Sequence, residues 1–188
     1  MKIAIMQPYY YPYAGYFRLF AATDIFVILD DVQWNRRGRV HRFESKGKWI
    51  TLPIKKTSRD TTRICDLQWQ EKIKEKYCGV GPINLIIGSI FNMCLELKIP
   101  FNTIRSSRMN LSDDFRGQGR IIAICKKLGA TEYINSPGGR HLYDEEEFIR
   151  NGIKLTFLPE YKGSYDSIIE RISREKPEDI RKEIYENI

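Results

Sequence analysis

The sequence predicts an α/β fold: a single domain with a largely parallel sheet flanked by helices. Short apolar runs alternate with helical patterns along the chain, which is typical of such sheets. Residues 25–29 form a continuous apolar run, the pattern of a parallel strand that is covered on both faces. No repeat, low-complexity tract or Gly/Ser linker divides the 188 residues. We therefore expect residues 1–188 to form one domain, with the ligand site at the carboxyl ends of the strands.

The first half of the chain carries three predicted strands. Residues 2–7 have the pattern of a buried strand, and a loop rich in Tyr and Pro leads from it to a helix that opens near Gly15. The second strand is the apolar run at 25–29. Residues 49–54 are the third strand, and Pro53 places it at a sheet edge or a bulge.

Helical patterns dominate the second half. Apolar residues recur at helical spacing over residues 83–97, after Pro82, which suits a first helical turn. Ser112 is the expected N-cap of the next helix, and Gly129 is the residue expected to end it. The remaining predicted elements are a strand at 131–135, a helix at 144–151, a strand at 153–158 and a helical tail at 164–188 that is interrupted near Pro177.

The net charge of +7 is concentrated in one part of the chain. Between Arg36 and Lys56, eight cationic residues stand against a single acid, Glu44. We call residues 36–56 the basic segment. A localised positive charge favours an anionic partner such as phosphate, nucleotide or nucleic acid. A solvated basic face is the alternative interpretation.

Cysteine, histidine and hydropathy patterns narrow the class of protein. The four cysteines are widely spaced and include no C-x-x-C pair, so we expect reduced thiols in a cytosolic interior. With two histidines, no metal site is evident. The chain begins on a strand pattern instead of a signal peptide, and its longest apolar stretch is far too short for a membrane span. We therefore expect a soluble cytoplasmic protein with no membrane insertion; the sequence leaves its oligomeric state open.

Residues 7–16 form a candidate binding loop. Two prolines restrict its backbone, and its tyrosines offer flat faces with hydroxyl tips that suit a base or a sugar. Gly15 would let an anionic group approach the backbone N–H groups at the helix start. The alternative is a rigid aromatic core, which would need a partner for each buried hydroxyl. The residues expected to contact the substrate are Gln7, Pro8, Tyr9, Tyr10, Tyr13, Gly15 and Tyr16.

Two adjacent aspartates end the strand at 25–29. Alternation along a strand sends Asp30 and Asp31 to opposite sides, so we expect them to have different roles. One could act as a general base on an amine or hydroxyl while the other orients an arginine; a strand end with a local ion pair is the structural alternative. His41 is a further candidate acid or base, with a pKa that nearby cations would lower. The expected substrate contacts in this part of the chain are Gln33, Arg36, Arg37 and Arg42.

The loop after the strand at 131–135 is a third candidate. Its sequence, Ser136 to Gly139, is one that the interior of a helix or strand would not tolerate. Paired glycines expose backbone N–H groups to an anion, and an arginine can clamp that anion in a fork. An ordinary tight turn is the alternative. The expected contacts are Asn135, Ser136, Gly138, Gly139 and Arg140.

Taken together, these segments resemble the WbqC-like protein family, which is named from O-antigen gene clusters. The resemblance is carried by residues 6–17, residues 30–42, the strand at 49–54, and residues 124–130 leading into the loop at 136–139. Arg39 stands where the family pattern has Trp, and His41 stands where it has Asn. The resemblance therefore gives no role to these two positions.

The resemblance implies a cytoplasmic enzyme of surface-polysaccharide (O-antigen, lipopolysaccharide) biosynthesis whose substrate is a nucleotide-linked amino sugar. The hypothesis it favours is an acyltransferase or aminoacyltransferase in which Asp30 or Asp31 deprotonates the amine. The arginines of the basic segment would hold the phosphates. An acyl or aminoacyl donor is required, and aminoacyl-tRNA is one candidate partner. The alternatives are a nucleotidyl-transfer enzyme, although no histidine occupies the opening loop, and an RNA-binding (tRNA-binding) module that combines tyrosines with basic residues.

Overall fold

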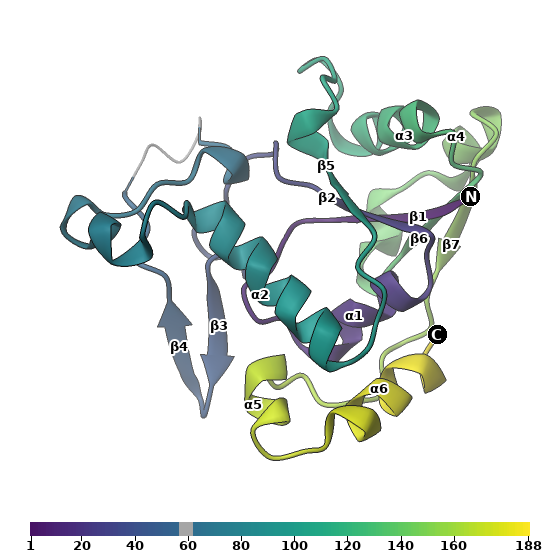
Figure 1. The fold of residues 1–188 in the computed structure, drawn as a ribbon. Coiled ribbons are helices and arrows are strands. Elements are labelled where there is room, and N and C mark those ends of the chain that lie inside the picture. The colour runs from purple at the N-terminus through teal and green to yellow at the C-terminus, as the bar shows by residue number, and fades with distance from the viewer. Residues whose placement is uncertain (57–61) are drawn as a thin grey trace.

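The computed structural model describes residues 1–56 and 62–188 and has a five-stranded sheet at its centre (Figure 1). The strands lie in the order β5-β2-β1-β6-β7, and each neighbouring pair is parallel. The α/β fold predicted from the sequence is therefore confirmed. The strands are β1 (Lys2–Met6), β2 (Ile25–Ile28), β5 (Thr103–Arg105), β6 (Glu132–Asn135) and β7 (Lys154–Phe157).

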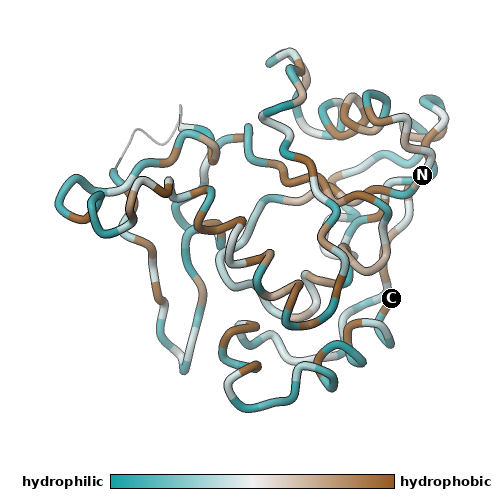
Figure 2. Tube along the Cα trace, viewed as in Figure 1, coloured by the Kyte–Doolittle hydropathy of each residue, from teal (hydrophilic) through white to brown (hydrophobic). Residues whose placement is uncertain are grey.

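Helices cover both faces of this sheet. Ala4 and Phe26 are register partners and point to one face, where they pack with apolar residues of α1, α2, α5 and α6. Ile5 and Val27 point to the other face and pack with α3 and α4. Figure 2 shows the hydrophobic colour along these central strands. The helices are α1 (Ala14–Ala21), α2 (Pro82–Glu96), α3 (Gly117–Leu128), α4 (Glu145–Arg150), α5 (Ile168–Ile172) and α6 (Pro177–Glu186).

The segment between β2 and α2 builds a third apolar cluster beside the sheet, with Trp34 and Trp69 among its buried residues. It also carries an antiparallel hairpin of β3 (Arg42–Ser45) and β4 (Lys48–Thr51), which projects from the body in Figure 1. The third predicted strand is therefore part of this hairpin and not of the main sheet. Lys46 and Gly47 both have positive φ, the backbone of a two-residue hairpin turn that returns the chain antiparallel.

Two local expectations differ from the structure. Helix α3 begins at Gly117 and not after Ser112, because the Ser112 hydroxyl accepts the N–H of Asp114 and closes a local turn. The segment after β6 is not simply a loop, since Pro137 opens a 3₁₀ helix. The 3₁₀ helices of the described chain are Ile64–Asp66, Glu71–Tyr77, Ser106–Arg108 and Pro137–Leu142.

Within residues 1–56 and 62–188, no single helix combines the length and the apolar composition that a membrane crossing requires. One pair of helices, Glu71–Tyr77 followed by α2, meets the criterion together by length and composition alone, and it is bent by 42°.

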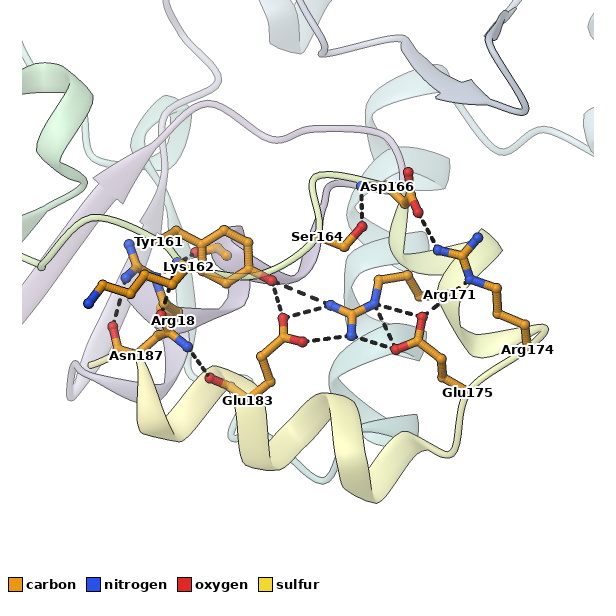
Figure 3. Close-up of polar contacts among 11 residues, drawn as sticks. Arg18, Tyr161, Lys162, Ser164, Asp166, Arg171, Arg174, Glu175, Glu183 and Asn187 are labelled. Carbon is orange, nitrogen blue, oxygen red and sulfur yellow. Dashed lines mark hydrogen bonds and ion pairs between the residues drawn. The ribbon is translucent and has the colours of Figure 1, made fainter.

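A buried arginine ties the C-terminal helices together (Figure 3). Arg171, at the end of α5 with a side chain 4% exposed, donates to both carboxylate oxygens of Glu183 on α6, at 2.7 and 2.8 Å. It also donates to Glu175 at 2.6 Å, and the hydroxyl of Tyr161 donates to Glu183. Burial raises the pKa of Glu183, but the hydrogen bonds from Arg171 and Tyr161 more than offset this, so the pKa lies below its ordinary value.

Replacing this arginine should destabilise the protein. We expect Arg171→Ala to lower the free energy of unfolding by about 3 kcal/mol, because it leaves the partly buried Glu183 without its cation and Glu175 with Arg174 alone. Arg174→Ala is the matched control, since the Arg174 side chain is 47% exposed and its ion pairs with Asp166, Glu170 and Glu175 are open to solvent on the arginine side, where ion pairs contribute little. Urea unfolding at pH 7 measures both values. Equal losses for the two variants would contradict a special role for Arg171.

Candidate functional site

The carboxyl ends of the central strands meet at one edge of the sheet, because the strands are parallel. The chain places β2 and β5 on one side of β1 but β6 and β7 on its other side, so the winding reverses between β1 and β6. Parallel sheets bind ligands outside the strand ends near such a reversal. The segments that leave this edge include residues 7–13, 29–33, 106–108 and 136–139.

Asp30 holds two of these segments together. Its side chain is fully buried, and it lies two residues after the end of β2 at Ile28. The carboxylate accepts from Arg105 Nε at 2.6 Å, from the N–H of Ser107 at 2.9 Å and from the Ser107 hydroxyl at 2.9 Å. These donors lie at and just after the end of β5. Asp30 therefore fixes the chain after β5 against the end of β2 and has no face open to a ligand.

Asp31 occupies a different environment. Its Oδ1 accepts from the Ser106 hydroxyl at 2.6 Å, and its Oδ2 forms an ion pair with Arg120 of α3. The same serine accepts the backbone N–H of Asp30 at 3.1 Å. The two aspartates share the Ser106 hydroxyl, which lies 3.3 Å from Asp30 Oδ1, but they pair with different arginines, Arg105 and Arg120. Asp31, unlike Asp30, lines a cavity.

This cavity, of about 480 Å³, lies between the end of β2 and the start of α3. Arg63 spans part of its rim and pairs with Asp113 at 2.6 Å. The first turn of α3 contains no acidic residue, and its N-cap, Arg116, makes no side-chain capping bond. A helix start with free N–H groups and an adjacent arginine favours an anion. We call this the edge cavity; its charged lining residues are Asp31, Arg63, Asp113, Arg116 and Arg120.

Arg120 adds a buried donor to the edge cavity. Its Nη1 donates to the carbonyl oxygens of Ser112 and Phe115, at 3.2 and 3.3 Å. Its Nε is buried and has no hydrogen-bond partner among the described residues. Buried N–H groups are rarely left without an acceptor.

The opening loop lies beside the basic segment, but the two are packed together. The N–H of Tyr10 donates to the carbonyl of Arg39 at 3.1 Å, and the rings of Tyr10 and Tyr11 lie about 5.4 and 5.3 Å from that of Phe43. Burial raises the pKa of Tyr10 to about 12. None of residues 7–16 lines the edge cavity.

Two other residues of the opening loop serve the core. Tyr16 is 3% exposed, and its hydroxyl donates to the carbonyl of Gln7 at 2.9 Å. A Cβ at Gly15 would lie 2.9 Å from the ring of Tyr161, so this glycine allows ring packing and has no space for an anion. The ring of Tyr13 stacks on Tyr165 with centroids 4.9 Å apart. Tyr16 therefore belongs to the aromatic core that was the alternative interpretation of this loop, and we leave Tyr16 and Gly15 out of the binding site. Tyr9, Tyr10 and Tyr13 are half-buried, and their contact with a ligand stays a prediction.

The basic segment lines a second cavity, of about 390 Å³. Arg36 lies there with its guanidinium 5.7 Å from the ring centroid of Trp34. Lys56 adds a second positive charge to the lining, and His41 adds a hydrogen-bond donor. Arg37 is exposed at the surface. We call this the hairpin cavity, because Thr51 of β4 also lines it. Three predicted contacts lie outside it: Arg37 is the exposed residue, Gln33 lines the edge cavity, and Arg42 stacks on Trp49 of the hairpin.

His41 is buried beside cations and is neutral near pH 7. Burial is the main cause of its lowered pKa, and the charges of Arg42 and Arg36 lower it further, to about 4. Its Nδ1 accepts the indole N–H of Trp34 at 3.3 Å. The ring proton therefore sits on Nε2, and His41 can offer a neutral hydrogen-bond donor in the hairpin cavity.

The segment after β6 makes its contacts with residues close to it in the structure. Asn135 is buried, and its Oδ1 accepts the N–H of Ser136 at 2.8 Å. A Cβ at Gly139 would lie 2.6 Å from the Asn135 amide nitrogen, so this position requires a glycine. Arg140 lies over the ring of Phe157, 4.6 Å from its centroid. Gly138 is exposed, and none of these residues lines either cavity.

Several residues that line the edge cavity or hold its aspartates were not found from the sequence. Ser106 and Ser107 follow β5, which at three residues is too short to show a periodic pattern. Arg116 and Arg120 were hidden because Ser112 was expected to start the helix. The arginine and serines at 105–107 after the apolar start of that strand were the available signal. Among the described residues, no group of three or more His, Cys, Asp or Glu side chains is arranged to hold a metal ion.

Comparison with known proteins places the chain in a family. Residues 7–79 and 81–171 match the model of the WbqC-like protein family. An uncharacterized protein of Mycobacterium tuberculosis is 26% identical over 201 residues, and the match covers 88% of this chain and 84% of that protein. No solved structure matches the chain.

The buried His41 should make folding stability depend on pH. Its pKa is near 4 in the folded chain and near 6.5 when unfolded, so acidification through this window protonates only the unfolded chain and lowers the free energy of unfolding. We expect His41→Gln to lose that part of the pH dependence, measured by urea unfolding between pH 7 and pH 5. The matched control, His141→Gln at an exposed position, should keep the wild-type dependence. An unchanged slope in His41→Gln would contradict the interpretation.

Proposed function

The chain belongs to the WbqC-like protein family, and we propose that it is an enzyme of surface-polysaccharide biosynthesis that transfers an acyl or aminoacyl group to a nucleotide-linked amino sugar. The observation that carries the proposal is the placement of Asp31 in a cavity lined by arginines at the carboxyl edge of the sheet. A carboxylate is the base that such a reaction needs, and the arginines and helix start suit the phosphates of the substrate.

The anionic part of the substrate would bind at the start of α3. Arg116 has no ion pair with an acidic side chain within the described parts of the chain, whereas Arg63 and Arg120 are paired with Asp113 and Asp31. A phosphate at the first turn would accept from backbone N–H groups and from Arg116. This arrangement supports a phosphate-bearing ligand over a neutral sugar.

The transfer itself would need one base and an activated donor. The amine nitrogen of the sugar attacks the carbonyl carbon of an ester or thioester donor, and a new C–N bond forms. The C–O or C–S bond of the donor breaks, and the leaving oxygen or sulfur takes up a proton from solvent. Asp31 accepts the proton that the amine loses. Ser106 and Arg120 hold the Asp31 carboxylate in place during this step.

Asp31→Asn should remove the base and keep the binding site. We expect kcat to fall by about 10²-fold to 10⁴-fold, the range for a general base, with little change in KM. The assay incubates the protein with nucleotide-linked amino sugars and acyl or aminoacyl donors and detects the product by mass. Asp114→Asn is the matched control, because Asp114 is exposed, bonds locally to Ser112 and lies outside the edge cavity. Wild-type kcat in a folded Asp31→Asn protein would remove this role.

Arg116→Ala should instead weaken substrate binding. Losing a charge-assisted hydrogen bond to phosphate costs roughly 1.5–3 kcal/mol, so we expect KM to rise about tenfold or more while kcat changes little. Arg116→Lys should restore part of the affinity. An unchanged KM in Arg116→Ala would show that the phosphates bind elsewhere.

A further inference from the structure

The outer face of the projecting hairpin carries an exposed tryptophan beside two arginines. Trp49 on β4 is 45% exposed. The guanidinium carbon of Arg42 lies 4.2 Å from the Trp49 ring centroid, and that of Arg39 lies 5.3 Å from it. Guanidinium planes and indole rings are both surfaces on which nucleic-acid bases stack. The cluster therefore combines a stacking surface with positive charge.

The arginine nearest this ring is held in position. Arg42 Nε donates to the carbonyl of Gly38 at 3.1 Å, and its Nη2 donates to the carbonyl of Arg37. Both acceptors are neutral, so the positive charge of Arg42 is not cancelled. Within the described residues, the ion pairs between acidic and basic side chains include none made by Arg42, Arg39 or Lys48.

The same face leads into the hairpin cavity. Arg42 and Thr51 are direct register partners, so their side chains lie on the same face of the hairpin. Trp49 precedes Thr51 by two residues on β4, so its side chain lies on that face too. Thr51 lines the hairpin cavity, where Arg36 and Lys56 supply further positive charge. No acidic residue is among the described residues that line this cavity. An aromatic platform is thus continuous with a basic cavity.

We propose that the outer face of the hairpin and the hairpin cavity bind a single-stranded polynucleotide, with a base against Trp49 and phosphates along the arginines. The basic segment, with its eight cations against one acid, favours a polyanion. A single strand is favoured over a duplex because stacking on a side chain needs an unstacked base. This site is separate from the edge cavity, and the proposal does not rest on the transfer reaction.

A membrane surface fits this hairpin less well. Membrane-binding segments gather their large apolar side chains on one face. Trp49 and Ile50 are both exposed, but they are consecutive on a strand and point to opposite faces, and Ile50 pairs with Phe43 on the inner face. The face that carries Trp49 is otherwise polar, with Glu44 as the register partner of Trp49 and Arg42 as that of Thr51.

Fluorescence anisotropy with labelled oligouridylate and oligothymidylate of about 12 nucleotides tests the proposal on the full chain. We expect binding that weakens as salt rises, with a slope of log K against log salt of about −2 to −3 for three or four phosphate contacts. Trp49→Ala should weaken binding by at least about fivefold, and Trp49→Phe should retain most of the affinity. Arg39→Ala should weaken binding and make the slope shallower by about 0.7.

Two controls make the result decisive. Lys126→Ala combined with Lys127→Ala removes two exposed charges from the end of α3, away from the hairpin, and should leave affinity unchanged. Asp31→Asn should also bind the oligonucleotide normally, which separates this proposal from the transfer reaction.

Four results would overturn the proposal. One is absence of binding at about 50 mM salt. Another is wild-type affinity in a folded Trp49→Ala protein. The third is equal binding of a duplex of the same length. The last is binding to vesicles of anionic lipid without binding to the oligonucleotides.

Discussion

A carboxylate that is closed off from water must find its hydrogen bonds inside the protein, and Asp30 does so by drawing together the ends of two strands. Its donors, Arg105 and Ser107, belong to the end of β5 and the turn that follows. This pairing stabilises a short edge strand of only three residues. It also places Ser106 where its hydroxyl reaches Asp31. The geometry of the edge cavity thus follows from one buried charge.

Of the two adjacent aspartates, Asp30 has a structural role and Asp31 is the proposed catalytic base. Asp30 is fully buried and accepts hydrogen bonds from Arg105 and Ser107. Asp31 accepts from one serine, pairs with one arginine and lines the edge cavity. Removing Asp30 would leave Arg105 without its carboxylate partner near the end of β5, so a loss of activity in such a variant would not identify a base. Replacing Asp31 likewise removes the carboxylate partner of Arg120, so its effect on activity is informative only in a variant shown to be folded. The proposed mechanism therefore depends on the environment of Asp31, which adjacency in the sequence does not reveal.

Sequence patterns predicted the parts of the fold that are long or apolar. The continuous run at 25–29 predicted β2 because a strand buried on both faces needs no alternation. The hairpin was missed because its turn, at Lys46 and Gly47, has an unusual positive-φ lysine that composition does not signal. The tyrosine loop was expected to face a ligand; Tyr10 and Tyr11 pack their rings on Phe43 and stay half-buried, so a ligand contact there remains a prediction. Long-range partners such as Arg120 for Asp31, 89 residues apart, cannot be inferred from local spacing.

A short pair of hydrogen-bonded backbone segments connects the edge cavity to the hairpin. The chain leaves the sheet through Val32 and Trp34 and returns through Thr62 and Ile64, where Trp34 N–H bonds to the Thr62 carbonyl at 2.9 Å and Ile64 N–H to the Val32 carbonyl at 3.0 Å. These backbone bonds lie directly beside Asp31, so the hairpin is anchored on a wall of the edge cavity. A polynucleotide held on the hairpin would consequently have a fixed position relative to the proposed base. If the polynucleotide carries the activated acyl group at its end, as an aminoacyl-tRNA does, this anchoring would determine how far that group reaches toward the edge cavity.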